Sequence, residues 1–181
     1  PKIIEQAIIR LTLHEVGHTL GLNHNFKGSY LHDIESVHKP EITSKTGVTA
    51  SVMEYPAINL APLNVEQGDY YDTIPGPYDI WAIKYGYTPD LSESELDEII
   101  SEQNKPEHMF ANDSEDMRSP GRGIDPRAMI NDLTNDPITY ASQRIELVNH
   151  SQENIVSKLS NKAKTFEEYR LAHGIFMREY S

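Results

Sequence analysis

Three histidines, one glutamate and one glycine stand at fixed spacings in HEVGHTLGLNHN, from His14 to Asn25. Residues four apart lie on one face of a helix, so His14 and His18 can direct their imidazoles at one metal ion. Gly21 allows the chain to reverse after the helix, which lets His24 return as a third ligand. The spacing therefore predicts a three-histidine metal site.

The ligand set of this site predicts zinc and hydrolysis. Three neutral imidazoles on Zn²⁺ leave a fourth position for water, as in catalytic rather than structural zinc sites. Glu15 lies one step around the helix, where it can take a proton from that water and deliver it to the leaving group. A distant glutamate, Glu35 or Glu41, is the alternative third ligand, and a helix that carries histidines by chance is the alternative to any metal site.

A second motif follows about thirty residues later in SVMEYP, residues 51–56. HEVGHTLGLNH fits HExxHxxGxxH, and with Met53 in this turn the chain resembles the metzincin zinc peptidases, in which a methionine turn supports the zinc site from below. In astacins and serralysins the tyrosine two residues after the methionine stabilises the transition state. The resemblance implies that role for Tyr55, whose alternative is a packed turn tyrosine.

A narrower resemblance covers most of the chain. The segments GLNHNFKGS, GVTASVMEYPAIN, GPYDIWAIKYGY, NDSEDM, IDPRAM and NDPITYASQRI are similar to the C-terminal catalytic part of large bacterial zinc-dependent metalloproteases. This implies a metalloendopeptidase acting on peptides or proteins, with upstream domains of the same protein as partners and an extracytoplasmic location: periplasmic, envelope or secreted. Asn25 departs from the Glu, Pro or Asp of better-known metzincins, so their substrate classes do not transfer.

Size and charge restrict the other possibilities. The chain has 181 residues, which fits one domain, and its net charge of −12 argues against nucleic acid as a partner. It has no cysteine, so thiolate metal sites are excluded. No apolar run approaches the roughly 18 residues of a membrane span. A zinc-stabilised binding or scaffold module without turnover, and a zinc hydrolase of non-peptide amides or esters, remain alternatives to the peptidase.

The elements that must position these residues are mainly helical. We expect a first helix over residues 2–20 with Gly21 just past its end, and then an irregular segment over 22–76. A helix over 77–86 is expected to end at Gly86, and a capping box of Ser92 and Glu95 is expected to open the next helix, which runs to about Gln103. Asp136-Pro137 should open a long helix to about Leu159, and a capping box of Thr165 and Glu168 should open a last helix to about Tyr180. The inward stripe predicted for the long helix is Ile138, Ala141, Ile145, Val148, Ile155 and Leu159.

The predicted fold is mainly α: a single metzincin-like zinc-binding subdomain over residues 1–181 with the zinc helix, the Met-turn loop and C-terminal helices. In metzincins a mostly β subdomain precedes the zinc helix, but this chain begins 13 residues before His14. The resemblance therefore implies that the β subdomain is absent, that the chain is a fragment of a longer protein, and that alone it cleaves peptides poorly.

Weaker candidates complete the set. The acidic stretch Asn112–Asp116, with Asp125 nearby, could hold calcium through oxygen ligands, or could be a solvated loop. Asp72 and Asp79 could orient a ligand histidine. The remaining histidines lack paired spacing and are expected at the surface or around the site: His32, His38, His108, His150 and His173.

Overall fold

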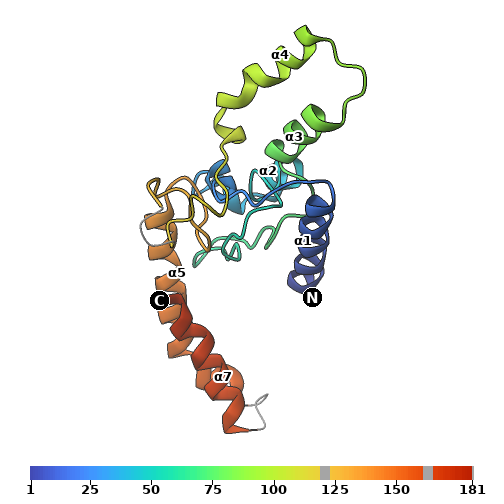
Figure 1. Ribbon diagram of the computed structural model, residues 1–181. Coiled ribbons are helices and arrows are strands. Elements are labelled where there is room, and N and C mark those ends of the chain that lie inside the picture. The colour runs from blue at the N-terminus through green and yellow to red at the C-terminus, as the bar shows by residue number, and fades with distance from the viewer. Residues whose placement is uncertain (119–122, 161–164, 181) are drawn as a thin grey trace.

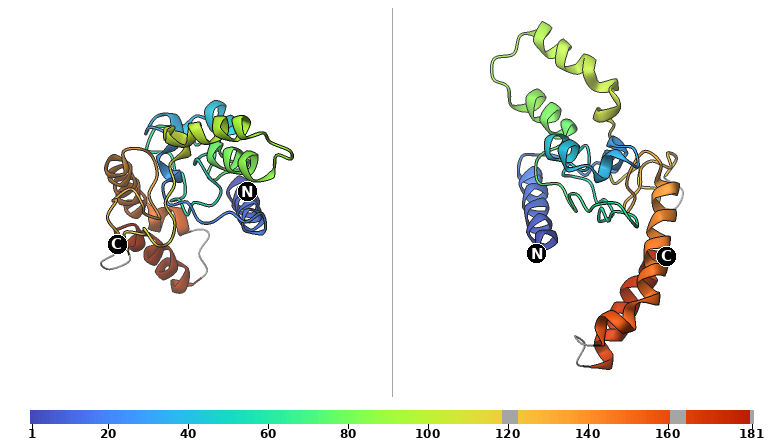
Figure 2. Two further views of the ribbon diagram at one scale, coloured as in Figure 1. Left: turned by 45° about the horizontal axis from the view of Figure 1, so that its top comes forward. Right: turned by 180° about the vertical axis from the view of Figure 1, so that it is seen from behind.

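The computed structural model describes residues 1–118, 123–160 and 165–180. Within these ranges helices are joined by long irregular segments, and no described residue lies in a β-strand. Figure 1 shows an irregular central body with α1 along one side, α3 and α4 projecting from one end, and a hairpin of α5 and α7 extending from the other. The view from behind in Figure 2 places α1 and the hairpin on opposite flanks of the body. The predicted mainly α fold is confirmed.

Helix α1 spans Lys2–Thr19 and ends as the sequence predicts. Gly21 has φ +84°, a left-handed conformation that a glycine adopts at little cost. Its amide donates to the carbonyl of His18 at 3.0 Å, and the amide of Leu22 donates to the carbonyl of Gly17 at 3.0 Å. This pair of hydrogen bonds is a Schellman motif, which satisfies the last helical carbonyls and turns the chain back toward the helix.

The inward face of α1 is polar or small. Its buried residues are Gln6, His14 and Gly17, whereas Ile8 and Leu11 are 60% and 53% exposed. Gln6 donates to the Asp69 carboxylate at 2.7 Å, and its own amide oxygen accepts from the backbone of the irregular segment. The first turns of the helix are therefore attached to the body through polar contacts, and Ile8 and Leu11 are open to solvent.

The segment after α1 is irregular, as predicted, with η1 (Gly28–Leu31), η2 (Ser36–His38) and α2 (Pro40–Thr46) as its only helical turns in the described chain. A compact apolar cluster lies beneath it and is formed by Val37, Val48, Leu133 and Tyr140. Leu133 and Tyr140 come from far along the sequence, so this cluster joins the start of the C-terminal helices to the body.

Helices α3 (Pro77–Tyr87) and α4 (Glu93–Ser101) form the projection at one end of the body. The Ser92–Glu95 capping box is confirmed, with the Ser92 amide donating to Glu95 Oε2 at 2.9 Å. The prediction that Gly86 ends α3 was wrong: the helix continues to Tyr87, because Gly86 does not take the left-handed conformation that ends a helix. Short 3₁₀ turns, η3 (Glu102–Asn104) and η4 (Pro106–His108), lead back to the body.

The C-terminal hairpin contains α5 (Pro137–Glu153), α6 (Ile155–Leu159), α7 (Phe166–Met177) and η5 (Arg178–Tyr180). Asp136 caps α5 and Glu168 caps α7, as predicted. The single helix expected from Pro137 to Leu159 is broken at Asn154. The Asn154 side chain donates to the carbonyl of His150 at 2.8 Å, so its backbone amide bonds to Ser151 instead and the helical ladder is interrupted.

The inward stripe predicted for α5 was largely wrong. The buried residues of the helix are Tyr140, Arg144 and Val148, spaced four apart, while Ile138 is 79% exposed. Arg144 is buried because it pairs with Glu179 at 2.7 Å and donates to the Ile58 carbonyl. Across the described ranges, no helix is both long and apolar enough to span a bilayer.

Candidate metal centre

Two of the predicted ligands lie on the inner edge of α1. His14 and His18 are one helical turn apart, and their ring centroids are separated by 4.8 Å. His14 is 1% exposed, whereas His18 faces solvent. The helix therefore places one imidazole inside the body and the next at its surface.

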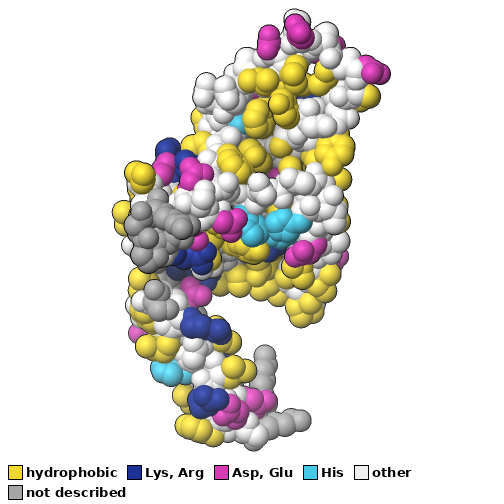
Figure 3. All heavy atoms as spheres, in the orientation of Figure 1, with side chains coloured by type: hydrophobic (Ala, Val, Ile, Leu, Met, Phe, Trp, Pro, Cys, Tyr) yellow, Lys and Arg dark blue, Asp and Glu magenta, His cyan; other side chains and the backbone are white. Residues whose placement is uncertain are grey.

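The Schellman turn returns His24 to the same place. Its ring centroid lies 5.4 Å from that of His14 and 4.9 Å from that of His18. Figure 3 shows histidine side chains gathered on the open face of the body, with acidic side chains on either side. The structure thus brings together the three histidines that the sequence singled out.

Hydrogen bonds fix which nitrogen each ring can offer to a metal. His14 Nδ1 donates to the Val52 carbonyl at 2.7 Å, and His18 Nδ1 donates to the Leu22 carbonyl at 3.1 Å. His24 Nδ1 donates to the Asp113 carboxylate at 2.9 Å. Because an acceptor faces every Nδ1, each proton is assigned to that atom and each Nε2 keeps its lone pair.

The three rings fit a metal ion. One nitrogen from each lies within 4.8 Å of the others, and no other such group of three occurs in the described chain. Tetrahedral zinc with Zn–N bonds of about 2.0–2.1 Å separates its ligand atoms by roughly 3.4 Å, so small ring rotations suffice. His14 Nε2 is buried and has no hydrogen-bond partner among the described residues. A buried nitrogen with an unused lone pair suits a ligand atom.

Burial lowers the pKa of His14 below its ordinary value, against the opposing effect of its hydrogen bond to Val52. The positive charge of Arg10 lowers this pKa further. A lowered pKa keeps the imidazole neutral, which is the form that binds metals. Glu35 and Glu41, the alternative third ligands, are exposed and lie outside this group.

Met53 lies directly against α1. It is fully buried, and its carbonyl accepts from the amide of Asn25 at 3.1 Å, which ties the Met-turn to the segment that carries the third histidine. A Cβ built on Gly17 would overlap the Met53 sulfur. Glycine at this helical position therefore allows the methionine to pack beneath the histidines.

Two buried carboxylates shape the Met-turn loop. Asp79 accepts from Ser51 Oγ at 2.6 Å and from the Val52 amide at 2.8 Å, and so holds the residue whose carbonyl binds His14. Asp72 accepts from the amides of Val48 and Thr49. Neither aspartate bonds directly to a ligand histidine, so the orienting role expected of them is indirect for Asp79, through Val52, and is not seen for Asp72. Burial raises the pKa of Asp72 to about 6.

Glu54 is a buried residue of the Met-turn to which no sequence motif points. Its carboxylate accepts from the amides of Ser29 at 3.1 Å and Tyr55 at 2.8 Å, and burial raises its pKa well above the ordinary value. Arg10 donates to the Glu54 carbonyl, and its guanidinium lies 5.2 Å from the Tyr55 ring centroid. In the sequence, only the position of Glu54 between Met53 and Tyr55 could have indicated that this residue belongs to the site.

Tyr55 reaches the metal group from the Met-turn side. Its hydroxyl donates to His24 Nε2 at 3.1 Å, and its ring centroid is 4.9 Å from that of His14. Glu15 lies on the exposed side of α1 and has no partner among the described residues. Tyr55 is therefore bonded to a ligand histidine, and the Glu15 carboxylate is open to solvent.

The acidic stretch gives no support to a calcium site. Asp113 binds His24, Asp116 pairs with Arg118, and Asp125 pairs with Arg127 and Lys27. Carboxylates paired with cations in this way are not arranged around a common point. Of the remaining histidines, expected at the surface or around the site, His150 and His173 are exposed. His32, His38 and His108 are buried, with 8%, 5% and 7% of their surface exposed, and they lie outside the group of three ligand histidines.

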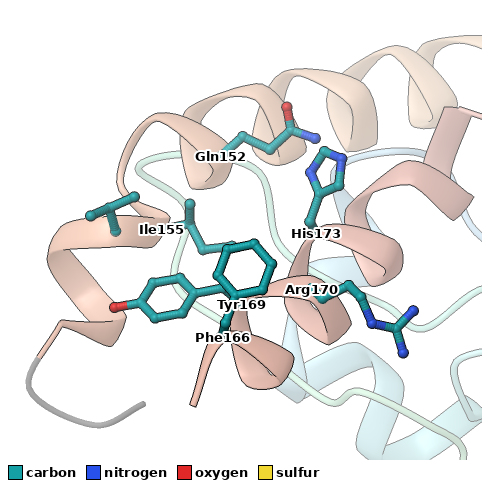
Figure 4. A pocket seen from close by; sticks show the side chains of 7 residues that line it. Gln152, Ile155, Phe166, Tyr169, Arg170 and His173 are labelled. Carbon is teal, nitrogen blue, oxygen red and sulfur yellow. The ribbon is translucent and has the colours of Figure 1, made fainter. Parts of the chain in front are cut away.

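Two hollows lie away from the three ligand histidines. Figure 4 shows one of about 670 Å³ between α5, α6 and α7, lined mainly by apolar side chains such as Ile155, Phe166 and Tyr169. Its titratable lining residues are Tyr169, Arg170 and His173, with no carboxylate among them. The other, of about 950 Å³, opens beside Pro56 and is lined in part by Arg118, Arg144 and Arg178.

A buried methionine packed under a helix that carries two histidines, with the third returned by a glycine turn, defines a domain of the metzincin type. The chain belongs to the Met-zincin family, whose sequence profile matches residues 1–181. No curated protein and no solved structure matches it. Family membership indicates a zinc-dependent, metallopeptidase-type enzyme.

Proposed function

We propose that this domain is a zinc metalloendopeptidase. One observation carries the proposal: every ligand histidine has its Nδ1 hydrogen-bonded to an oxygen, and the rings converge at an open face. His14, His18 and His24 would hold the ion, and the open side would admit water and substrate. When bound, zinc acts as a Lewis acid and lowers the pKa of water toward 7.

Glu15 is the general base and acid in this proposal. Its free, exposed carboxylate follows His14 on the same helix, so it can take a proton from the attacking water and deliver it to the leaving amine. A scaffold without turnover has no use for a carboxylate at this position. Glu15 therefore favours the enzyme over the zinc-stabilised binding module.

Tyr55 is the proposed oxyanion donor. Its hydroxyl donates to His24 Nε2. A bound metal ion would use the lone pair of that nitrogen and so displace the hydroxyl. Once that lone pair is used, the hydroxyl is free to donate to the developing oxyanion of the substrate. Met53 and Gly21 support the site and take no part in the chemistry.

We further propose that residues 1–181 act as a single catalytic subdomain within a longer protein. The open apolar face of α1, where Ile4, Ile8 and Leu11 are all more than half exposed, supports contact with additional domains of that protein.

An extracytoplasmic location is proposed from the resemblance to exported bacterial metalloproteases. Cell fractionation with an antibody to the domain tests it, and recovery in the cytoplasm alone would refute it.

The experiment combines metal analysis with peptide cleavage. The wild-type chain, purified without added metal, should contain about one zinc per chain, and His18→Ala should contain none. Glu15→Gln should keep the zinc and lose roughly 100-fold to 10⁴-fold in cleavage of a mixed peptide library. Cleavage of esters but not peptides would favour the non-peptide hydrolase. Full activity in Glu15→Gln would remove the base assignment.

A further inference from the structure

We propose that Asn25 and Asp113 are positioning residues for the third histidine: Asn25 anchors the segment that carries Asp113, and Asp113 orients His24. The inference rests on the proposed zinc site and concerns how that site is assembled. It assigns a role to the residue that follows the HExxHxxGxxH motif and to part of the acidic stretch.

His24 differs from the other two ligands in how it is held. His14 and His18 donate to backbone carbonyls, and the acceptor of His18 is only four residues away in sequence. His24 donates to a side-chain carboxylate that is 89 residues away, with Nδ1 at 2.9 Å from Asp113 Oδ1 and 3.0 Å from Oδ2. The orientation of the third ring therefore depends on a segment that follows α4 and returns to the body (Figure 1).

Asn25 holds that segment in place. It is fully buried, its side-chain amide donates to the Met109 carbonyl at 3.0 Å, and its oxygen accepts from the Ala111 amide at 3.3 Å. The next residue, Phe26, donates its own amide to the Ala111 carbonyl at 2.8 Å. The returning segment is thus bonded to the two residues that directly follow His24.

The chemistry of these contacts requires a carboxamide. The Asn25 side chain is a donor to one backbone group and an acceptor from another at the same time. An aspartate can only accept when ionised, so it would leave the Met109 carbonyl without a donor and repel it. This accounts physically for asparagine at the position after the third histidine.

A tight turn completes the placement of Asp113. Asn112 Oδ1 accepts from the Ser114 amide at 2.9 Å, and the Glu115 carboxylate accepts from the Asn112 amide at 3.1 Å. These bonds fix the backbone on both sides of Asp113. Among the described residues, the Asp113 carboxylate hydrogen-bonds only to the His24 imidazole.

An acceptor on Nδ1 keeps the proton there and the Nε2 lone pair directed at the metal. Loss of such a partner typically weakens metal binding by about 10-fold to 100-fold. The Asp113 side chain is 66% exposed, and solvent can partly replace it, so we expect about 10-fold for Asp113→Ala. Asn25→Asp should give a similar loss, because it displaces the whole segment.

The test measures zinc affinity by competition with a chelating dye for the wild-type chain, Asp113→Ala, Asn25→Asp and Asp97→Ala. Asp97 is an exposed α4 aspartate without a contact in the described chain, so its variant is a matched control for the lost charge. Histidine ¹⁵N NMR on the metal-free proteins reports the His24 tautomer separately. Circular dichroism checks that each variant is folded, and Asp113→Ala, being at the surface, keeps the test valid if Asn25→Asp does not fold.

Weaker zinc binding in Asp113→Ala, with a mixed His24 tautomer and an unchanged Asp97→Ala, supports the inference. Wild-type affinity in Asp113→Ala overturns it while leaving the zinc site intact. If the wild-type chain takes up no zinc, the proposed function fails instead. The NMR measurement still decides the inference in that case, because an unchanged tautomer in Asp113→Ala refutes it.

Discussion

Gly17→Ala is the substitution whose effect the structure defines most sharply. In the interior of an exposed helix, Gly→Ala normally stabilises a protein by about 0.5–1 kcal/mol. Gly17 is in the interior of α1, but it faces Met53. An added Cβ would overlap the Met53 sulfur and lie 3.6 Å from Cε and 3.7 Å from Cγ, so the methionine side chain must move as a whole.

Met53 has little room to move, because it is fully buried. Overpacking of this kind costs about 1–3 kcal/mol, of which the helical preference of alanine offsets about 0.5–1 kcal/mol. We therefore expect a net loss of about 1–2 kcal/mol. For a chain of this length, that lowers the melting temperature by roughly 2–8 °C. Displacing the Met-turn also shifts the Val52 carbonyl that holds His14, so zinc should bind more weakly.

Thermal unfolding of the metal-free chain, followed by circular dichroism, measures the effect. Gly174→Ala is the matched control: it lies in α7, and a Cβ there meets nothing within 4 Å. It should raise the melting temperature slightly. A double-mutant cycle with Met53→Ala isolates the contact, because Gly17→Ala should cease to destabilise once the larger side chain is gone.

Stabilisation by Gly17→Ala as large as that by Gly174→Ala would refute a tight contact between Gly17 and Met53. A coupling energy below about 0.5 kcal/mol in the cycle would refute it as well, since contacting residues couple by more than that. Either result would mean that the methionine does not pack against α1.

Three further predictions follow. Gly21→Ala puts a side chain on a residue with φ +84° and should lower the free energy of unfolding by about 1–2 kcal/mol. The control Gly86→Ala should not destabilise the chain, because a Cβ there meets nothing within 4 Å. Equal effects of the two substitutions would contradict the role of the left-handed turn. Tyr55→Phe should lower kcat about 100-fold and leave zinc content unchanged, and an unaltered kcat would remove the oxyanion role. Burial raises the pKa of Asp72 from 3.8 to about 6, so its contribution to folding is full below pH 3.8 and is lost as pH rises through 6. Asp72→Asn should therefore gain on wild type by roughly 2–3 kcal/mol between pH 4 and pH 7.5 in denaturant unfolding, and a gain independent of pH would show the pKa to be unshifted.

Much of the local structure could be predicted from the sequence because short-range interactions decide it. The end of α1 at Gly21, the cap of α4 at Ser92 and the cap of α5 at Asp136 each depend on groups within a few residues. The convergence of His14 and His18 follows from the pitch of the helix alone. Where a local rule failed, as in the break at Asn154, a side chain competed with the backbone for the same carbonyl.

Burial could not be read from the sequence, because it depends on what covers each face. The apolar residues of α1 are open while Gln6 and His14 are buried, since the body meets the helix on its polar side. The buried stripe of α5 includes Arg144, which tolerates burial through its ion pair with Glu179. Apolar periodicity identified both helices, but of the inward stripe predicted for α5 only Val148 is among its buried residues.

The sequence by itself determined the ligand types, the spacing of His14 and His18, and the glycine that returns His24. These depend on helical geometry and on the chemistry of imidazole. Only the tertiary structure decided what holds each ligand: Val52 on His14, and Asp113, 89 residues away, on His24. Such contacts join segments that no periodic pattern relates, because their distance in space is set by the packing of the whole chain.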